Sequence, residues 1–85
     1  MYNLNTYKQE IIAISAANGN VDIGVATDMF LSNIQDAGKE GDRYHYAGAD
    51  HIDYAALRPH YKELAESKTV FLEEWGKELG YLNDR

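Results

Sequence analysis

The sequence predicts an all-α protein: a small bundle of three to four helices, with a long amphipathic C-terminal helix and a central loop that contains glycine and tyrosine. Apolar residues recur at helical spacing in three separate segments. Glycines and a single proline fall between these segments, where we expect the chain to change direction. Too few segments resemble strands to form a sheet, so helices are favoured throughout.

The chain has 85 residues, a length that suits one domain, and we expect residues 1–85 to form a single small helical domain. A chain this short has a small core. It must therefore rely on well-packed helices, on oligomerisation or on a partner.

Two residues compete as the N-cap of the first helix. Thr6 could form a capping box with Gln9. Asn3 could instead provide the cap, and Tyr2 would then pack against Tyr7. In either case we expect apolar residues on one helix face, namely Tyr7, Ile11 and Ile14.

The second helix is expected from about Asp22, a competent N-cap, to Ala37. Gly19 should end the preceding helix in a left-handed conformation. The apolar stripe of the second helix consists of Ile23, Ala26, Phe30 and Ile34.

The central loop, residues 38–50, is where we expect the clearest contact residues. It carries the run Arg43-Tyr44-His45-Tyr46 between glycines. Tyrosine and arginine dominate the energetic hot spots of protein interfaces. The alternative is that Tyr44 and Tyr46 fold back to cover the core, and the two interpretations are compatible.

The last third of the chain should begin with a short helix that Asp50 and Asp53 open and that runs through Leu57. Pro59 should push Arg58 out of helical geometry and start the long C-terminal helix. The apolar stripe of that helix is Tyr61, Leu64, Phe71, Trp75, Leu79 and Leu82.

Lys68 interrupts this stripe on its apolar side. Its stem could lie along the apolar surface and carry the ammonium group to water. It could instead be a polar residue in the seam between two helices.

Composition excludes several functional classes. The chain has no cysteine, which rules out disulfides, cysteine-ligated metals and a cysteine nucleophile. No apolar run is long enough for a transmembrane helix, and the N-terminus lacks the features of a secretory signal, so we expect a cytoplasmic protein. The net charge of -6 argues against direct binding of nucleic acid or of anionic membranes, and favours a protein partner with a basic surface.

No motif indicates catalysis or a bound metal, and we expect neither an enzyme nor a cofactor. The serines lack a nucleophile-elbow context. The spacing of His45, His51 and His60 does not match that of metal ligands on one helix face.

The carboxylates are the remaining sequence feature that could indicate a function. Spaced along helices, they could be a solvated surface, or they could imitate the charge of a nucleic-acid backbone and occupy a basic groove. The candidate partner-binding residues are therefore Arg43, Tyr44, His45, Tyr46, Asp50, Asp53, Glu63, Glu66, Glu73 and Glu74.

In size, acidity, lack of cysteine and tyrosine content, the chain resembles the small acidic inhibitors that phages make against host defence or transcription proteins, including anti-CRISPR proteins. The resemblance implies an inhibitor that covers the nucleic-acid-binding surface of its target, in the host cytoplasm if a phage encodes it. The alternative is a structural or adaptor subunit that forms a homodimer, or docks on a larger assembly, through its C-terminal helix.

Overall fold

The computed structural model describes residues 2–37 and 46–79, and all regular secondary structure within them is helical. The predicted all-α class is confirmed. Two 3-10 segments accompany the α-helices. The order is η1 (Leu4–Tyr7), α1 (Lys8–Ala17), α2 (Ile23–Asp36), α3 (Tyr54–Leu57), η2 (Arg58–His60), α4 (Tyr61–Glu66) and α5 (Lys68–Leu79).

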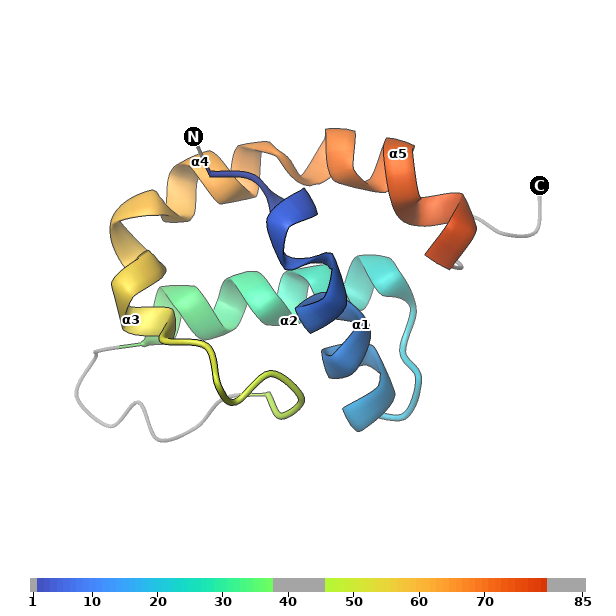
Figure 1. The fold of residues 1–85 in the computed structure, drawn as a ribbon, viewed down its shortest axis with the longest axis horizontal. Helices are drawn as coiled ribbons and strands as arrows, with labels where there is room; N and C mark the ends of the chain where they lie inside the picture. The colour runs from blue at the N-terminus through green and yellow to red at the C-terminus, as the bar shows by residue number, and fades with distance from the viewer. Residues whose placement is uncertain (1, 38–45, 80–85) are drawn as a thin grey trace.

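Helix α2 lies at the centre of the fold and contacts α1, α3, α4 and α5 (Figure 1). Its most extensive contact is with α1, which precedes it in the chain. Helices α4 and α5 run along the other side of α2, above it in the figure. The N-terminal segment crosses from α4–α5 to α1 and so connects the two sides.

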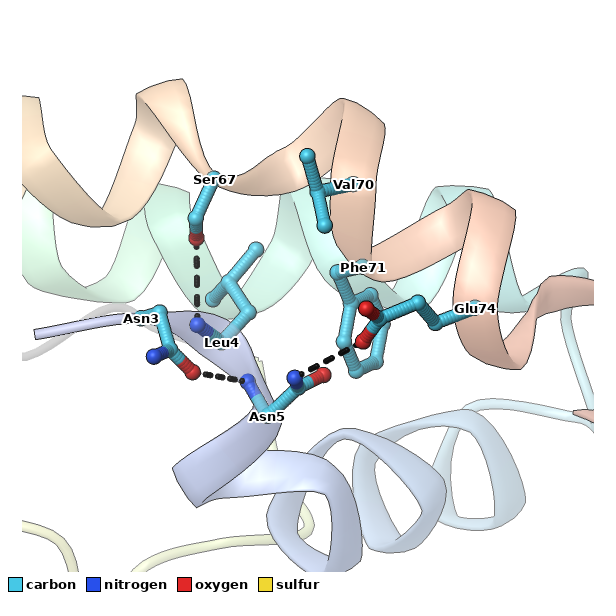
Figure 2. Close-up of a pocket in the computed structure, with 7 residues that line it drawn as sticks. All are labelled: Asn3, Leu4, Asn5, Ser67, Val70, Phe71 and Glu74. Carbon is cyan, nitrogen blue, oxygen red and sulfur yellow. Dashed lines mark hydrogen bonds between the residues drawn. The ribbon is translucent and has the colours of Figure 1, made fainter.

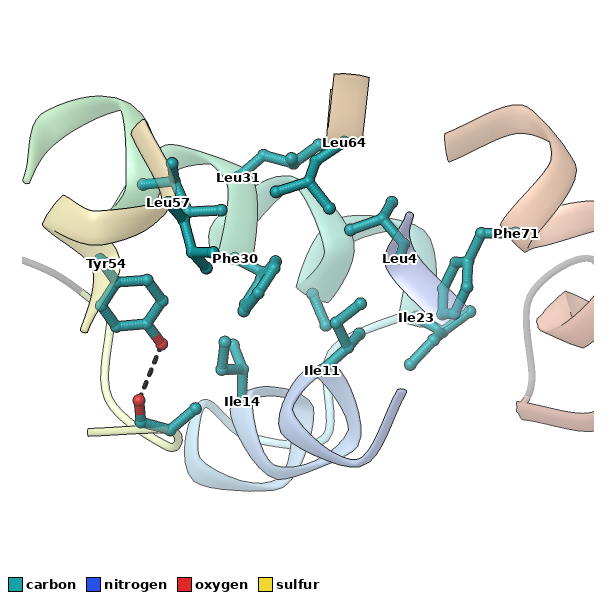
Figure 3. Packing of buried hydrophobic residues seen from close by; sticks show 13 residues of the cluster. Leu4, Ile11, Ile14, Ile23, Phe30, Leu31, Tyr54, Leu57, Leu64 and Phe71 are labelled. Carbon is teal, nitrogen blue, oxygen red and sulfur yellow. Dashed lines mark hydrogen bonds between the residues drawn. The ribbon is translucent and has the colours of Figure 1, made fainter. Parts of the chain in front are cut away.

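One cluster of buried side chains fills the space between these helices (Figure 3). Phe30 of α2 lies in the middle of it, with the Tyr7 and Tyr54 rings 5.3 and 5.8 Å away between centroids. The predicted stripe of α2 is buried in full. The cluster comprises Leu4, Ile11, Ile14, Ile23, Ala26, Phe30, Leu31, Ile34, Ala49, Tyr54, Leu57, Leu64 and Phe71.

Of the two predicted starts for the first helix, the structure uses Asn3. Its side chain accepts a hydrogen bond from the Asn5 N–H at 2.9 Å, and the chain enters α1 through a 3-10 turn. Tyr2, which the sequence placed against Tyr7, stacks on the His60 ring at a centroid distance of 3.7 Å. This stacking attaches the N-terminus to the start of α4.

The connection between α1 and α2 follows the prediction. Gly19 has a φ of +86°, and the Asn20 N–H donates to the Ser15 carbonyl at 2.7 Å, which closes the end of α1. Asp22 caps α2 by accepting from the Gly24 N–H at 2.8 Å.

The prediction for Arg58 is wrong. Its φ of -57° and ψ of -40° are helical, although Pro59 follows it. Proline disfavours helical geometry in the residue before it but does not forbid it. The chain instead tightens into a 3-10 turn, in which the Tyr61 N–H donates to the Arg58 carbonyl, so α3 leads through η2 into α4.

The predicted single long C-terminal helix is also wrong, because it divides into α4 and α5 at Ser67. The Ser67 hydroxyl donates to the Leu64 carbonyl at 2.7 Å, and the Ser67 N–H donates to the same carbonyl at 3.0 Å. A serine hydroxyl that takes a backbone acceptor competes with the regular helix ladder. The same hydroxyl accepts from the Leu4 N–H at 3.0 Å, so the break is also the docking point of the N-terminal segment.

Lys68, at the start of α5, occupies a helix–helix seam. Its ammonium group bonds the Asp28 carboxylate of α2 at 2.5 Å, and the lysine side chain is 33% exposed. The residue therefore combines the two interpretations, because it joins α5 to α2 while its partner Asp28, with a side chain 63% exposed, stays at the solvent surface. The ion pair connects α5 to α2 at the edge of the core.

We expect Ser67→Ala to lower the free energy of unfolding by about 2 kcal/mol, because it leaves the N–H of the fully buried Leu4 without its acceptor. Chemical denaturation followed by circular dichroism measures this change. Thr69→Ala, an exposed position two residues along, is the control and should shift stability by less than about 0.5 kcal/mol. Equal effects of the two substitutions would contradict this role of Ser67.

Candidate functional site

The last part of the central loop, residues 46–50, is held against α1 and α2 by polar side chains. Asn33 of α2, which is 2% exposed, forms two hydrogen bonds with the backbone of Tyr46. The Tyr46 N–H donates to Asn33 Oδ1 at 2.9 Å, and Asn33 Nδ2 donates to the Tyr46 carbonyl at 3.0 Å. One buried amide thus satisfies both backbone polar groups of Tyr46.

Two further side chains fix the same segment. Asn18 Nδ2 donates to the Ala47 carbonyl at 3.0 Å, and the Tyr54 hydroxyl donates to the carbonyl of the fully buried Ala49 at 2.9 Å. Gly48, between them, has a φ of +125° and lies directly on α1. A Cβ atom at this position would lie 2.6 Å from the Ala13 carbonyl oxygen, so only glycine fits.

Of the four residues in the predicted contact run, Arg43 to Tyr46, the structure describes Tyr46. The backbone of Tyr46 is fixed and its side chain is half-buried. Arg43, Tyr44 and His45 lie outside the described residues, so their interface role stays a prediction. Asp53 has a structural function because it caps α3 by accepting from the Ala56 N–H at 3.3 Å.

The outer surface of α4 and α5 is acidic. We call it the acidic face and define it as Glu63, Glu66, Glu73, Glu74 and Glu78, all of which are exposed. Lys62 is an exposed cation on these helices, whereas Lys68 is paired with Asp28. The face therefore keeps an excess of negative charge among its described side chains.

Two of these glutamates also hold the N-terminal segment. A Glu63 carboxylate oxygen accepts from the Tyr2 N–H at 3.0 Å, and Glu74 Oε1 accepts from Asn5 Nδ2 at 3.0 Å. Both carboxylates stay exposed while they make these bonds. Their positions are consequently fixed relative to the backbone.

The predicted site residues do not form one group. Asp50 and Asp53 belong to the segment before α3, which lies on the opposite side of α2 from α5 (Figure 1). The predicted glutamates Glu63, Glu66, Glu73 and Glu74 lie together on α4 and α5. The structure thus separates the glutamates from the aspartates.

The sequence did not predict a groove of about 340 Å³ that opens between the N-terminal segment and α5 (Figure 2). Its polar rim and apolar walls come from Asn3, Leu4, Asn5, Ser67, Val70, Phe71 and Glu74. Val70, 52% exposed, is the sequence signal that could have indicated it, because it is an apolar residue beside the buried stripe. The groove forms because the N-terminal segment crosses beside α5, and the apolar periodicity of the helices does not indicate that crossing.

No group of three or more histidines, aspartates or glutamates in residues 2–37 and 46–79 is placed to hold a metal ion. None of the helices in those residues combines the length and the apolar character that crossing a bilayer requires. Comparisons of the chain with protein-family models, with curated proteins and with solved structures found no match. Any functional argument therefore depends on the residues themselves.

We expect Gly48→Ala to destabilise the protein by about 3 kcal/mol or more, because a disfavoured backbone conformation is combined with a clash against α1. Gly19→Ala is the matched control. It has a φ of +86° but nothing within 4 Å of its Cβ position, so it should lose only about 1 kcal/mol. Thermal or chemical unfolding of both variants measures the difference, and similar losses would show that the contact with α1 is unimportant.

Stability should also fall above pH 10, because burial raises the pKa of the Tyr54 phenol above its usual value of 10.0. The nearby Asp50 and Glu10 carboxylates raise it further, while a hydrogen bond with Asn33 lowers it. The unfolded chain then releases the proton first, so the stabilisation is complete below pH 10 and declines as the pH rises through the folded-state pKa.

Tyr54→Phe tests this assignment. At neutral pH it should lose about 1 kcal/mol, from the missing bond to the Ala49 carbonyl. Above pH 10 its stability should decline less steeply than that of the wild type, as denaturant titrations at several pH values measure. Parallel curves would contradict a contribution from Tyr54, since Tyr7, whose pKa burial also raises, is present in both proteins.

Proposed function

We propose that this chain is a non-enzymatic, acidic protein-interaction module that inhibits its target by covering a basic, nucleic-acid-binding surface. The observation that carries the proposal is the acidic face on α4 and α5. Its glutamates are exposed, and one of the lysines on the same helices is paired with Asp28. A surface of one sign steers a partner of the opposite sign and contributes to specificity.

The charge spacing of the face supports imitation of a nucleic-acid backbone. A helix rises about 1.5 Å per residue, so the span from Glu63 to Glu78 is roughly 22 Å. The glutamates of the acidic face are then on average roughly 5–6 Å apart along that span, compared with about 3.4 Å between charges on each strand of B-DNA. The acidic face is less densely charged than a DNA strand, but its carboxylates are close enough together to contact neighbouring cations of a groove that binds phosphates.

The central loop remains part of the proposal as a second contact. Arg43, Tyr44 and His45 would act as anchors beside Tyr46, whose backbone is held by Asn33. Small acidic inhibitors of the phage type, including anti-CRISPR-like proteins, are the class that this combination fits best. The proposed compartment is the cytoplasm, where such targets are found.

The alternative function, a homodimer or adaptor that docks through the apolar stripe of its C-terminal helix, has less support. Leu64 and Phe71 are buried within the chain's own core. Trp75 is half-buried, and the Lys8 ammonium lies 3.5 Å from the centre of its ring. Much of the stripe is therefore already covered by the same chain.

Capture of target proteins from native host lysate, followed by mass spectrometry, tests the proposal. Glu66→Gln combined with Glu73→Gln removes two charges from the acidic face without removing a bond to the N-terminal segment. We expect this pair to reduce recovery of a basic nucleic-acid-binding protein at least several-fold, and excess target DNA or RNA to compete with the wild type. Raising the salt from about 0.1 to 1 M, which shortens the Debye length from about 10 to 3 Å, should abolish capture.

The matched control pair is Asp22→Asn with Asp53→Asn. It removes the same charge away from the acidic face, and it keeps both helix caps because asparagine is an equally good N-cap. Recovery should be nearly unchanged. A loss with this pair instead of the glutamate pair, or capture indifferent to salt, would contradict the acidic face as the binding surface.

A further inference from the structure

The groove between the N-terminal segment and α5 combines two kinds of surface in a small space (Figure 2). Leu4, Val70 and Phe71 make its apolar part. Asn3, Asn5 and Glu74 bring amide and carboxylate oxygens to its rim. No lysine or arginine is among the lining residues.

The rim is preorganised by bonds within the chain. Asn5 Nδ2 donates to Glu74 Oε1 at 3.0 Å, and Asn3 Oδ1 accepts from the Asn5 N–H at 2.9 Å. Ser67 holds the Leu4 backbone at 3.0 Å on the opposite side. A ligand that enters therefore meets a site whose polar groups are already positioned, which reduces the ordering cost of binding.

We propose that this groove receives an arginine side chain of the partner protein. The inference rests on the proposed function and specifies which residue type of the partner binds beside the acidic face. Charge complementarity selects a cation, since Glu74 is the charged lining group and the acidic face surrounds it. Shape and polarity then select arginine. Its apolar stem covers Val70, which is 52% exposed, and its guanidinium donates to the Glu74 carboxylate and to the amide oxygens of the rim.

Lysine fits this groove less well. Its ammonium is compact and strongly hydrated, whereas the guanidinium is planar, weakly hydrated and carries five donors in a fixed geometry. Three acceptor side chains at the rim match a donor fork better than a single point charge. Arginine is also common at the centres of protein interfaces and on surfaces that bind phosphate.

The test uses the full-length chain, isotopically labelled, and three small probes read by NMR: Nα-acetylarginine amide, the lysine equivalent, and the neutral citrulline equivalent. Arginine amide should shift the Val70 methyl and Asn5 side-chain amide signals in a saturable way, with a dissociation constant on the order of 1–10 mM, as suits so small a ligand. Lysine amide should bind at least about threefold more weakly, and citrulline amide should give no saturable shift.

Glu74→Gln and Glu73→Gln are the matched variants, because they remove the same charge from adjacent exposed positions and only Glu74 lines the groove. Glutamine at position 74 can still accept from Asn5, so the rim is kept. We expect arginine amide to bind at least about tenfold more weakly to Glu74→Gln, which loses a charged hydrogen-bond acceptor, and only about two- to threefold more weakly to Glu73→Gln, which loses surrounding charge alone. Equal effects of the two variants, equal shifts from citrulline, or no saturation up to tens of millimolar would overturn the arginine site.

This result is separable from that of the proposed function. If the probe experiment fails while the Glu66/Glu73 pair still weakens capture, the acidic face stands without an arginine groove. If the probe binds but the Glu66/Glu73 pair does not reduce capture, the groove is a cation site that the proposed partner does not use. The inference then fails together with the proposed function. With the captured target, Glu74→Gln must reduce recovery more than Glu73→Gln does.

Discussion

The hydroxyl of Ser67 is the interaction on which much of this structure depends. It donates to the Leu64 carbonyl and accepts from the Leu4 N–H, so one side chain both interrupts the C-terminal helical segment and binds the N-terminal one. Leu4 is fully buried in the core as a result. With the N-terminal segment held there, Glu63 accepts from the Tyr2 N–H and Glu74 accepts from the Asn5 side chain. The groove forms between this segment and α5. The candidate binding surface is therefore composed of two segments more than 60 residues apart in the chain.

Charge is distributed unevenly around this framework. Lys68 is neutralised by Asp28 across the seam of α2 and α5, and Lys8 lies over the Trp75 ring. The glutamates of α4 and α5 remain exposed to solvent. Carboxylates at helical spacing are common as a solubilising surface. What favours binding here is that Glu63 is held by the Tyr2 N–H and Glu74 by the Asn5 side chain, and that Glu74 borders a groove with apolar walls.

The other side of α2 depends on buried polar contacts. Asn33 bonds both backbone groups of Tyr46, Asn18 and Tyr54 bond the carbonyls of Ala47 and Ala49, and Gly48 allows this segment to reach α1. A loop without regular structure can be packed only when its peptide groups find such partners. The backbone of the central loop is consequently fixed from Tyr46 onward.

The sequence by itself determined the helical class, the apolar stripe of α2, the cap at Asp22 and the left-handed end at Gly19. It also offered Asn3 as one of two caps for the first helix, and Asp50 with Asp53 as the start of the third. Each of these follows from residues within about one or two turns of one another, where periodicity and capping act. The same local information placed the glutamates of the acidic face on one segment. The sequence did not predict helical geometry at Arg58, although it arises in a local 3-10 turn. Tertiary structure alone decided the contact of Ser67 with Leu4, the hydrogen bonds that hold residues 46–49 to α1 and α2, and the groove at Glu74. These features depend on groups that are distant in sequence, because a hydroxyl or an amide side chain has several local partners and only packing determines which one it binds.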